Sequence, residues 1–69
     1  MSKNRYNRIK IVLAEKEKSA KWLAEQLDRD KSTISRWCTN DMQPTIEMFY
    51  QIAEVLDIEV RELFVPSKG

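Results

Sequence analysis

A short stretch near the middle of the chain is rich in side chains that donate hydrogen bonds: Lys31, Ser32, Thr33, Ser35 and Arg36. The apolar residues of the same stretch, Ile34 and Trp37, are three positions apart, so on a helix they share one face. The polar and basic side chains then point elsewhere. Ammonium, guanidinium and hydroxyl groups pair with the acceptors on base edges and with phosphate oxygens. The spacing predicts a helix whose outer face binds in a groove of DNA.

The preceding residues predict a second helix that holds the first in place. Leu23, Ala24 and Leu27 recur at helical spacing over residues 20–27, and Ser19 is a suitable N-cap. Residues 28–30 form the expected turn, with Asp30 as the N-cap of a helix over 31–39. Asn40 suits the end of that helix, because Asn tolerates a positive φ angle.

Three further helices are expected around this pair. The first covers about residues 5–16, capped by Asn4, with Tyr6, Ile9, Val12 and Leu13 on its inner face. Another covers about 46–56 with Thr45 as N-cap, and its apolar stripe is Ile46, Phe49, Ile52, Ala53 and Leu56. A short last helix over 60–64 returns Leu63 and Phe64 to the core.

Composition supports an all-α fold, a compact five-helix bundle that contains a helix-turn-helix. The 69 residues include one Gly and two Pro, and no alternating β-branched run is long enough for a strand. The length predicts a single domain over 1–69, with a core at about 5–65 and a loose tail at 66–69. A domain of this size buries a modest fraction of its surface, so a homodimer is plausible.

The residues that catalysis and metal binding most often need are scarce. The chain has no His and one cysteine, Cys38, so we expect no metal site, no cofactor, no small-molecule ligand and no enzymatic activity. Cys38 is interpreted as a half-buried filler, with a redox role as the lesser alternative. No apolar run approaches ~18 residues, and the basic, polar residues at 1–10 lead us to expect no signal peptide. We therefore expect a cytoplasmic protein with no membrane contact.

The net charge of +1 conceals two unlike halves. Residues 1–40 carry ten Lys and Arg against five Asp and Glu, whereas residues 41–69 carry two against six. The basic half contains the expected helix pair. This polarity is typical of a small protein that places one end on phosphates and turns the other away.

Over residues 5–65 the chain resembles the Cro-type phage-repressor helix-turn-helix family, also called xenobiotic-response-element-like and lambda-repressor-like. The matching segments are residues 7–10, 23–27, 32–37, 43–44, 52–54 and 62–64. The resemblance implies a bacterial transcriptional regulator that binds double-stranded DNA. It also implies that residues 31–39 form the recognition helix. The residues implied to face bases are Lys31, Ser32, Thr33, Ser35 and Arg36. Arg36 is the leading candidate, because Arg pairs bidentately with guanine.

Candidate phosphate contacts follow from the resemblance and its departures. Residues 39–40 match a loop that touches the DNA backbone, and Ala20 replaces a Gln that often clamps a phosphate, so a neighbour must do that work. Asp28 stands where the family prefers Gly, which implies mild strain at a positive φ angle. The expected contacts are Ser19, Lys21, Arg29, Thr39 and Asn40. A peripheral group of cations overlaps with this set at Lys21, and about two of its members are expected to contact phosphate: Arg5, Arg8, Lys10, Lys18 and Lys21.

A group of apolar residues off the main stripe of the helix over 46–56 and just beyond it predicts a dimer interface: Met48, Tyr50, Val55, Ile58 and Val60. A two-fold dimer would place two recognition helices about 34 Å apart on a palindromic operator. Two alternatives remain open. One is a protein-interaction module on a helix-turn-helix scaffold, favoured by the acidic half. The other is an antitoxin-type regulator.

Overall fold

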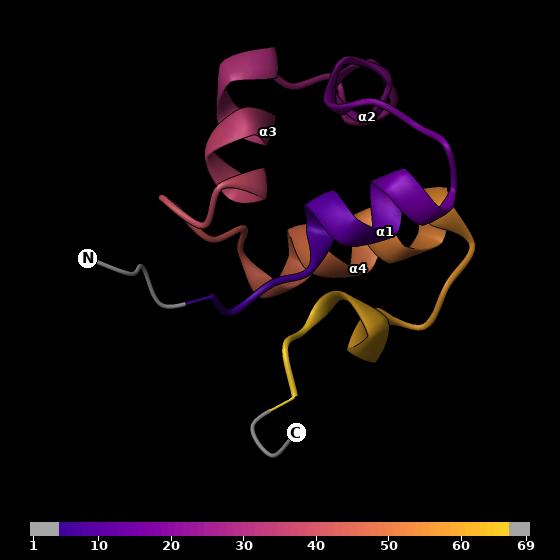
Figure 1. Cartoon of the computed structure of the whole chain (residues 1–69). Coiled ribbons are helices and arrows are strands. Elements are labelled where there is room, and N and C mark those ends of the chain that lie inside the picture. Colours follow the sequence, from indigo (N-terminus) through magenta and orange to yellow (C-terminus); the bar gives the residue numbers. More distant parts are fainter. Residues whose placement is uncertain (1–4, 67–69) are drawn as a thin grey trace.

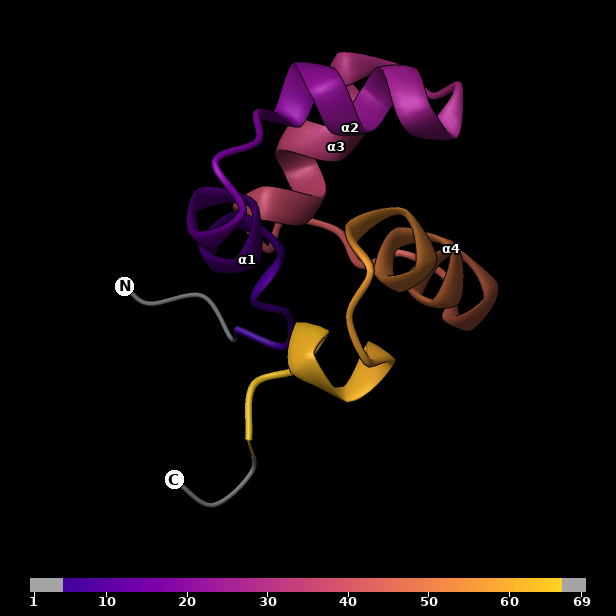
Figure 2. The same ribbon diagram turned by 90° about the vertical axis from the view of Figure 1, so that its right-hand side faces the viewer.

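The computed structural model describes residues 5–66, and its regular elements there are four α-helices and one 3₁₀-helix. They are α1 (Ile9–Glu15), α2 (Ala20–Leu27), α3 (Lys31–Cys38), α4 (Ile46–Leu56) and the 3₁₀-helix η1 (Val60–Leu63). α2 and α3 lie together at one end of the molecule and η1 lies at the other (Figures 1 and 2). The all-α prediction is confirmed, but the fifth element is a 3₁₀-helix of four residues.

Local capping explains why α2 and α4 have the predicted bounds. The hydroxyl oxygens of Ser19 and Thr45 accept from the backbone N–H of the residue three positions on, at 3.0 and 3.1 Å. Both helices end at an aspartate with positive φ, Asp28 at 54° and Asp57 at 59°. The strained position predicted for Asp28 is therefore present. Asp30 occupies the N-cap position of α3, but its side chain makes no capping hydrogen bond, contrary to expectation.

α1 begins at Ile9, four residues later than predicted. Residues 6–8 are held in an extended segment beside residues 63–65 by two backbone bonds, from the Arg8 amide to the Leu63 carbonyl (2.7 Å) and from the Val65 amide to the Tyr6 carbonyl (3.1 Å). The Tyr6 side chain is 58% exposed, so its placement in the core was wrong. The proposed cap Asn4 lies outside the described residues.

One apolar core joins all five elements. Its buried residues are Ile9, Val12, Leu13, Leu23, Ala24, Ile34, Trp37, Met48, Phe49, Ile52, Ala53, Leu56 and Leu63. Two predictions for α4 were wrong: Ile46 is 65% exposed and Met48 is buried. The stripe is centred near Ile52 and Leu56, and at 3.6 residues per turn Met48 lies nearer that centre than Ile46 does.

The end of the apolar sequence differs in part from expectation. Leu63 is fully buried, but Phe64 lies at the surface, with its ring tilted by 42° against that of Phe49 at a centroid distance of 4.6 Å. No helix among residues 5–66 is long and apolar enough to span a bilayer.

Candidate nucleic-acid interface

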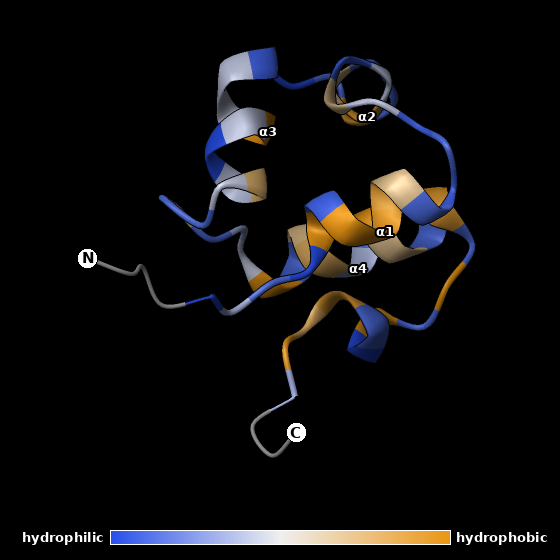
Figure 3. Ribbon diagram, in the orientation of Figure 1, coloured by the Kyte–Doolittle hydropathy of each residue, from blue (hydrophilic) through white to orange (hydrophobic). Residues whose placement is uncertain are grey.

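The outer face of α3 presents the side chains that the sequence singled out. Lys31, Ser32, Ser35 and Arg36 are exposed and Thr33 is half-buried. Ile34 and Trp37 hold the opposite face in the core, 0% and 5% exposed. Among residues 5–66, the side chains of Lys31, Ser32, Ser35 and Arg36 make no hydrogen bond or ion pair; the one side-chain bond to Arg36 goes to its backbone carbonyl, from the Thr39 hydroxyl. Most of α3 is hydrophilic, in contrast to the middle of α1 (Figure 3). This face is free to bind an external ligand.

A groove of about 360 Å³ borders α3 on the side of α1 and the start of α2. We call it the Lys10–Lys18 groove, and its lining residues are Lys10, Leu13, Ala14, Lys18, Ala20, Ser35, Cys38 and Thr39. The lining contains two cations and no carboxylate. The ammonium of Lys18 lies over the Trp22 ring, 4.9 Å from its centre, which is a cation–π contact. The groove is therefore basic, has no carboxylate in its lining and lies beside the exposed face of α3, so it can attract an anion.

A second hollow lies at the turn between α2 and α3 and has a different charge. Three cations line it (Lys21, Arg29 and Lys31), and so do three carboxylates, those of Glu25, Asp28 and Asp30. The opposite charges cancel at short range, so this hollow attracts an anion less than the Lys10–Lys18 groove does. Lys21 and Arg29, both predicted phosphate contacts, lie here.

The polar side chains of the loop after α3 make hydrogen bonds within the protein. The Thr39 hydroxyl lies within hydrogen-bonding distance of the Asp41 carboxylate at 2.7 Å and of the Arg36 carbonyl at 3.2 Å, so its single proton is engaged. The side-chain oxygen of Asn40 accepts from the backbone N–H groups of Tyr6 and Asn7 at 2.9 and 3.1 Å. The side chains of Thr39 and Asn40 thus have structural partners where phosphate contacts were expected.

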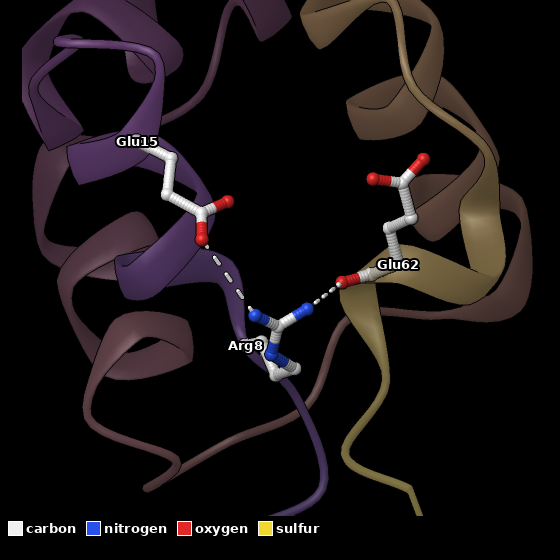
Figure 4. Close-up of polar contacts among 3 residues, drawn as sticks. All are labelled: Arg8, Glu15 and Glu62. Atoms are coloured by element: carbon white, nitrogen blue, oxygen red, sulfur yellow. Dashed lines mark hydrogen bonds and ion pairs between the residues drawn. The ribbon is translucent and has the colours of Figure 1, made fainter.

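Arg8 also has an internal task. Its guanidinium donates to the Glu62 carbonyl at 3.0 Å and lies 3.9 Å from the Glu15 carboxylate, so it joins the start of α1 to η1 (Figure 4). Of the five peripheral cations, Lys10 and Lys18 line one groove together.

The thiol of Cys38 lies at the Lys10–Lys18 groove, half-buried as expected. Burial raises its pKa above the ordinary value of 9.0, and the positive charge of Lys10 partly opposes this rise. The thiol is therefore protonated and weakly nucleophilic at neutral pH.

The predicted dimer surface is only partly exposed. Met48 is buried in the core and cannot contribute, and Val55 is half-buried. Tyr50 is 61% exposed, and with Ile58 and Val60 it lines a hollow of about 380 Å³ between α4 and η1. Ile46 lies one helical turn before Tyr50 and is also exposed, although the sequence pattern placed it in the core.

Sequence reasoning quoted Asn7 within a matching segment but gave it no structural role. Asn7 is the one buried polar residue of the described chain, at 4% exposed, and its side chain bonds to Ile9, Trp37 and Gln43. A signal was available, because an Asn two positions before the first buried apolar residue is a typical helix-capping residue. Asn4 competed for that role.

Comparisons with known proteins agree with this architecture. The sequence profile of the family described as Helix-turn-helix matches residues 9–63. Among solved structures, a chain described as a "putative DNA-binding protein" from Bacteroides fragilis is 48% identical and superposes with a TM-score of 0.86. The match covers 87% of this chain and 97% of that one. No curated protein matches.

Proposed function

This chain belongs to the Cro-type helix-turn-helix family, and on that basis we propose that it is a transcriptional regulator that binds double-stranded DNA with sequence specificity. The observation that carries the proposal is the free, basic face of α3 directly beside the acid-free Lys10–Lys18 groove. The description of the Bacteroides fragilis protein supports it.

In the proposed complex α3 lies in the major groove. Arg36 pairs with a guanine, and Lys31, Ser32, Thr33 and Ser35 face bases or the nearest phosphates. The Lys10–Lys18 groove takes a backbone phosphate. Two cations without a neighbouring carboxylate supply the attraction, and the Ser19 hydroxyl at the start of α2 is close in sequence to both Lys18 and the groove residue Ala20.

We further propose that Lys21 and Arg29 are peripheral contacts, since acids surround them. The side chain of Asn40 is no longer among the phosphate contacts, because its amide is engaged by the segment at 6–7. The protein performs no chemistry: occupancy of a site in the cytoplasm blocks or recruits polymerase.

The proposed active form is a homodimer on a palindromic operator. Tyr50, Ile58 and Val60 form its contact surface, with Ile46 added and Met48 and Val55 removed from the surface that the sequence suggested. This surface lies on α4 and η1, so α3 remains exposed in each copy.

The test is selection from a pool of random duplex DNA, carried out with wild type, Arg36→Ala and Arg61→Ala. Arg61 is a matched control, because it is an exposed Arg on η1, far from α3 (Figure 1). We expect wild type and Arg61→Ala to enrich the same inverted repeat, and Arg36→Ala to lose preference at one position of each half-site. If the folded wild type enriches nothing at low salt, the proposal fails.

A further inference from the structure

The side chain of Asn7 links the start of one helix to the end of another. Its Oδ1 accepts from the Ile9 backbone N–H at 3.1 Å, and its Nδ2 donates to the Trp37 carbonyl at 3.0 Å and to Gln43 Oε1 at 2.7 Å. The Ile9 amide is the first of α1, and Trp37 lies in the last turn of α3. Amides and carbonyls at these positions lack partners within their own helices. The Trp37 carbonyl also accepts from the Asn40 backbone N–H at 3.1 Å, so Asn7 is its second donor. One buried side-chain amide therefore bonds both to the first turn of α1 and to the last turn of α3.

These bonds supply directional information that the core cannot. Ile34 and Trp37 hold α3 by apolar packing, which is proportional to buried area and insensitive to direction. A hydrogen bond, in contrast, weakens steeply when its angle departs from linearity. The contact from Asn7 to Trp37 thus restricts how α3 rotates and slides relative to α1.

Two parts of the proposed DNA contact lie on either side of this link. The base-reading residues are on α3, whereas Lys10 lies on α1, three residues after Asn7. We propose that Asn7 is a positioning residue for base recognition, which aligns the outer face of α3 with the Lys10–Lys18 groove. This inference rests on the function proposed above.

The alignment matters more for specific than for non-specific binding. A non-specific complex needs only charge near phosphates, and this tolerates loose geometry. A specific complex must satisfy base contacts and phosphate contacts at the same time, because the phosphate contacts fix the register in which bases are read. Loosening the link between α1 and α3 therefore lowers affinity for the operator and leaves affinity for other duplexes nearly unchanged.

The experiment compares Asn7→Ser with Ile52→Val. Ser keeps an oxygen that caps α1 but has no amide to reach the end of α3. Ile52→Val shortens a fully buried core side chain on α4, which makes it a control for general loss of stability. Dissociation constants are measured for the selected operator and for an unrelated duplex, at a temperature where both variants are folded by circular dichroism.

We expect Asn7→Ser to reduce the ratio of operator to non-operator affinity about tenfold, which is the scale of one lost base pair contact. Ile52→Val should leave that ratio unchanged. A second variant, Gln43→Leu, removes one partner of the Asn7 amide at an exposed position and should reduce the ratio by a smaller factor, even if Asn7→Ser does not fold.

An unchanged ratio in Asn7→Ser and Gln43→Leu, or an equal change in Ile52→Val, would overturn the inference while the proposed function stands. If the wild type itself shows no operator preference, the proposed function fails and the inference fails with it.

Discussion

The side-chain amide of Asn40 pairs with both backbone polar groups of Asn7. Its Oδ1 accepts from the Asn7 N–H at 3.1 Å, and its Nδ2 donates to the Asn7 carbonyl at 3.3 Å. The amide thus takes the place of a neighbouring β-strand for this residue. Asn40 itself has a φ angle of 63°, a conformation that Asn adopts more readily than most residues. The cost of the positive φ angle at Asn40 is offset by the hydrogen bonds that its side chain makes to the backbone of Asn7, 33 positions away.

Glycine substitutions separate these two contributions. Asn40→Gly relieves the positive φ angle but removes the whole amide, so we expect the free energy of unfolding to fall by about 1–2 kcal/mol. Asp28→Gly relieves a similar angle of 54° where no side-chain hydrogen bond is present within residues 5–66, so we expect a gain of up to about 1 kcal/mol. Urea unfolding of both variants gives the two values. A gain in Asn40→Gly would show that the amide pairing contributes little.

The Lys10–Lys18 groove predicts a particular dependence of binding on salt. Each phosphate contact that is lost reduces the slope of log affinity against log salt concentration by about 0.9. Because the groove takes one phosphate, we expect Lys10→Gln combined with Lys18→Gln to reduce the slope by about 0.9, measured by fluorescence anisotropy on the selected operator. Lys16→Gln is the control, because Lys16 is exposed at the end of α1 and does not line the groove. Equal slopes in the wild type, the double variant and Lys16→Gln would contradict the proposal that this groove binds a phosphate.

Cys38 offers a chemical probe of the same groove, since it is the one cysteine of the chain. Its raised pKa means that the thiolate forms only at high pH, so alkylation by iodoacetamide should be slow at pH 7.5 and accelerate as the pH passes 9.0. Lys10→Gln should slow it further, because the charge that favours the thiolate is gone. Bound operator should protect the thiol. Mass spectrometry follows the reaction, and an alkylation rate that DNA leaves unchanged would contradict the proposed placement.

The same pKa shift predicts a small effect on stability. The folded state holds the thiol neutral at a pH where the unfolded chain already releases the proton. The contribution of Cys38 to folding is therefore complete below pH 9.0 and is lost as the pH rises through the folded-state pKa. Unfolding of wild type and Cys38→Ala at pH 7.5 and pH 10 should show a larger loss for wild type. An equal loss in both would mean that the thiol is effectively solvated.

A negative charge introduced into the proposed dimer surface tests whether two copies associate through it. Tyr50→Glu places a carboxylate in a hollow that Glu54 and Glu59 already line, so repulsion between copies should shift the protein towards monomers. Ile11→Glu serves as the control, because Ile11 is exposed on α1. Sedimentation with and without operator DNA gives the mass. Wild type that stays monomeric under both conditions would exclude the dimer.

The accuracy of the sequence-based predictions followed the range of the interactions involved. Ser19 and Thr45 cap their helices through residues three positions away, so α2 and α4 were predicted residue by residue. The start of α1 depends on Asn7, for which a local signal existed, and on the pairing of Asn7 with Asn40, which spans 33 positions and which no local pattern reveals. The polar face of α3 was visible because periodicity alone defines it.

The surfaces built by several helices were harder to predict. The sequence does not distinguish Lys10 and Lys18 from Lys21. The packing of α1, α2 and α3 places the first two in a groove without carboxylates and Lys21 in a hollow that three carboxylates line. Met48 and Ile46 exchanged places because a small shift in helical phase decides between core and surface.

The pairing of residues 6–8 with residues 63–65 makes the described chain almost a closed ring. A short peptide linker between the two ends should therefore allow backbone cyclisation without moving a helix, and chains whose ends lie close together are well suited to circular permutation. The paired segments 6–8 and 63–65 lie near η1, at the edge opposite α2 (Figure 2). A fluorescent protein fused there, or a solid support attached there, would lie away from α3. The recognition helix could then still bind a long duplex.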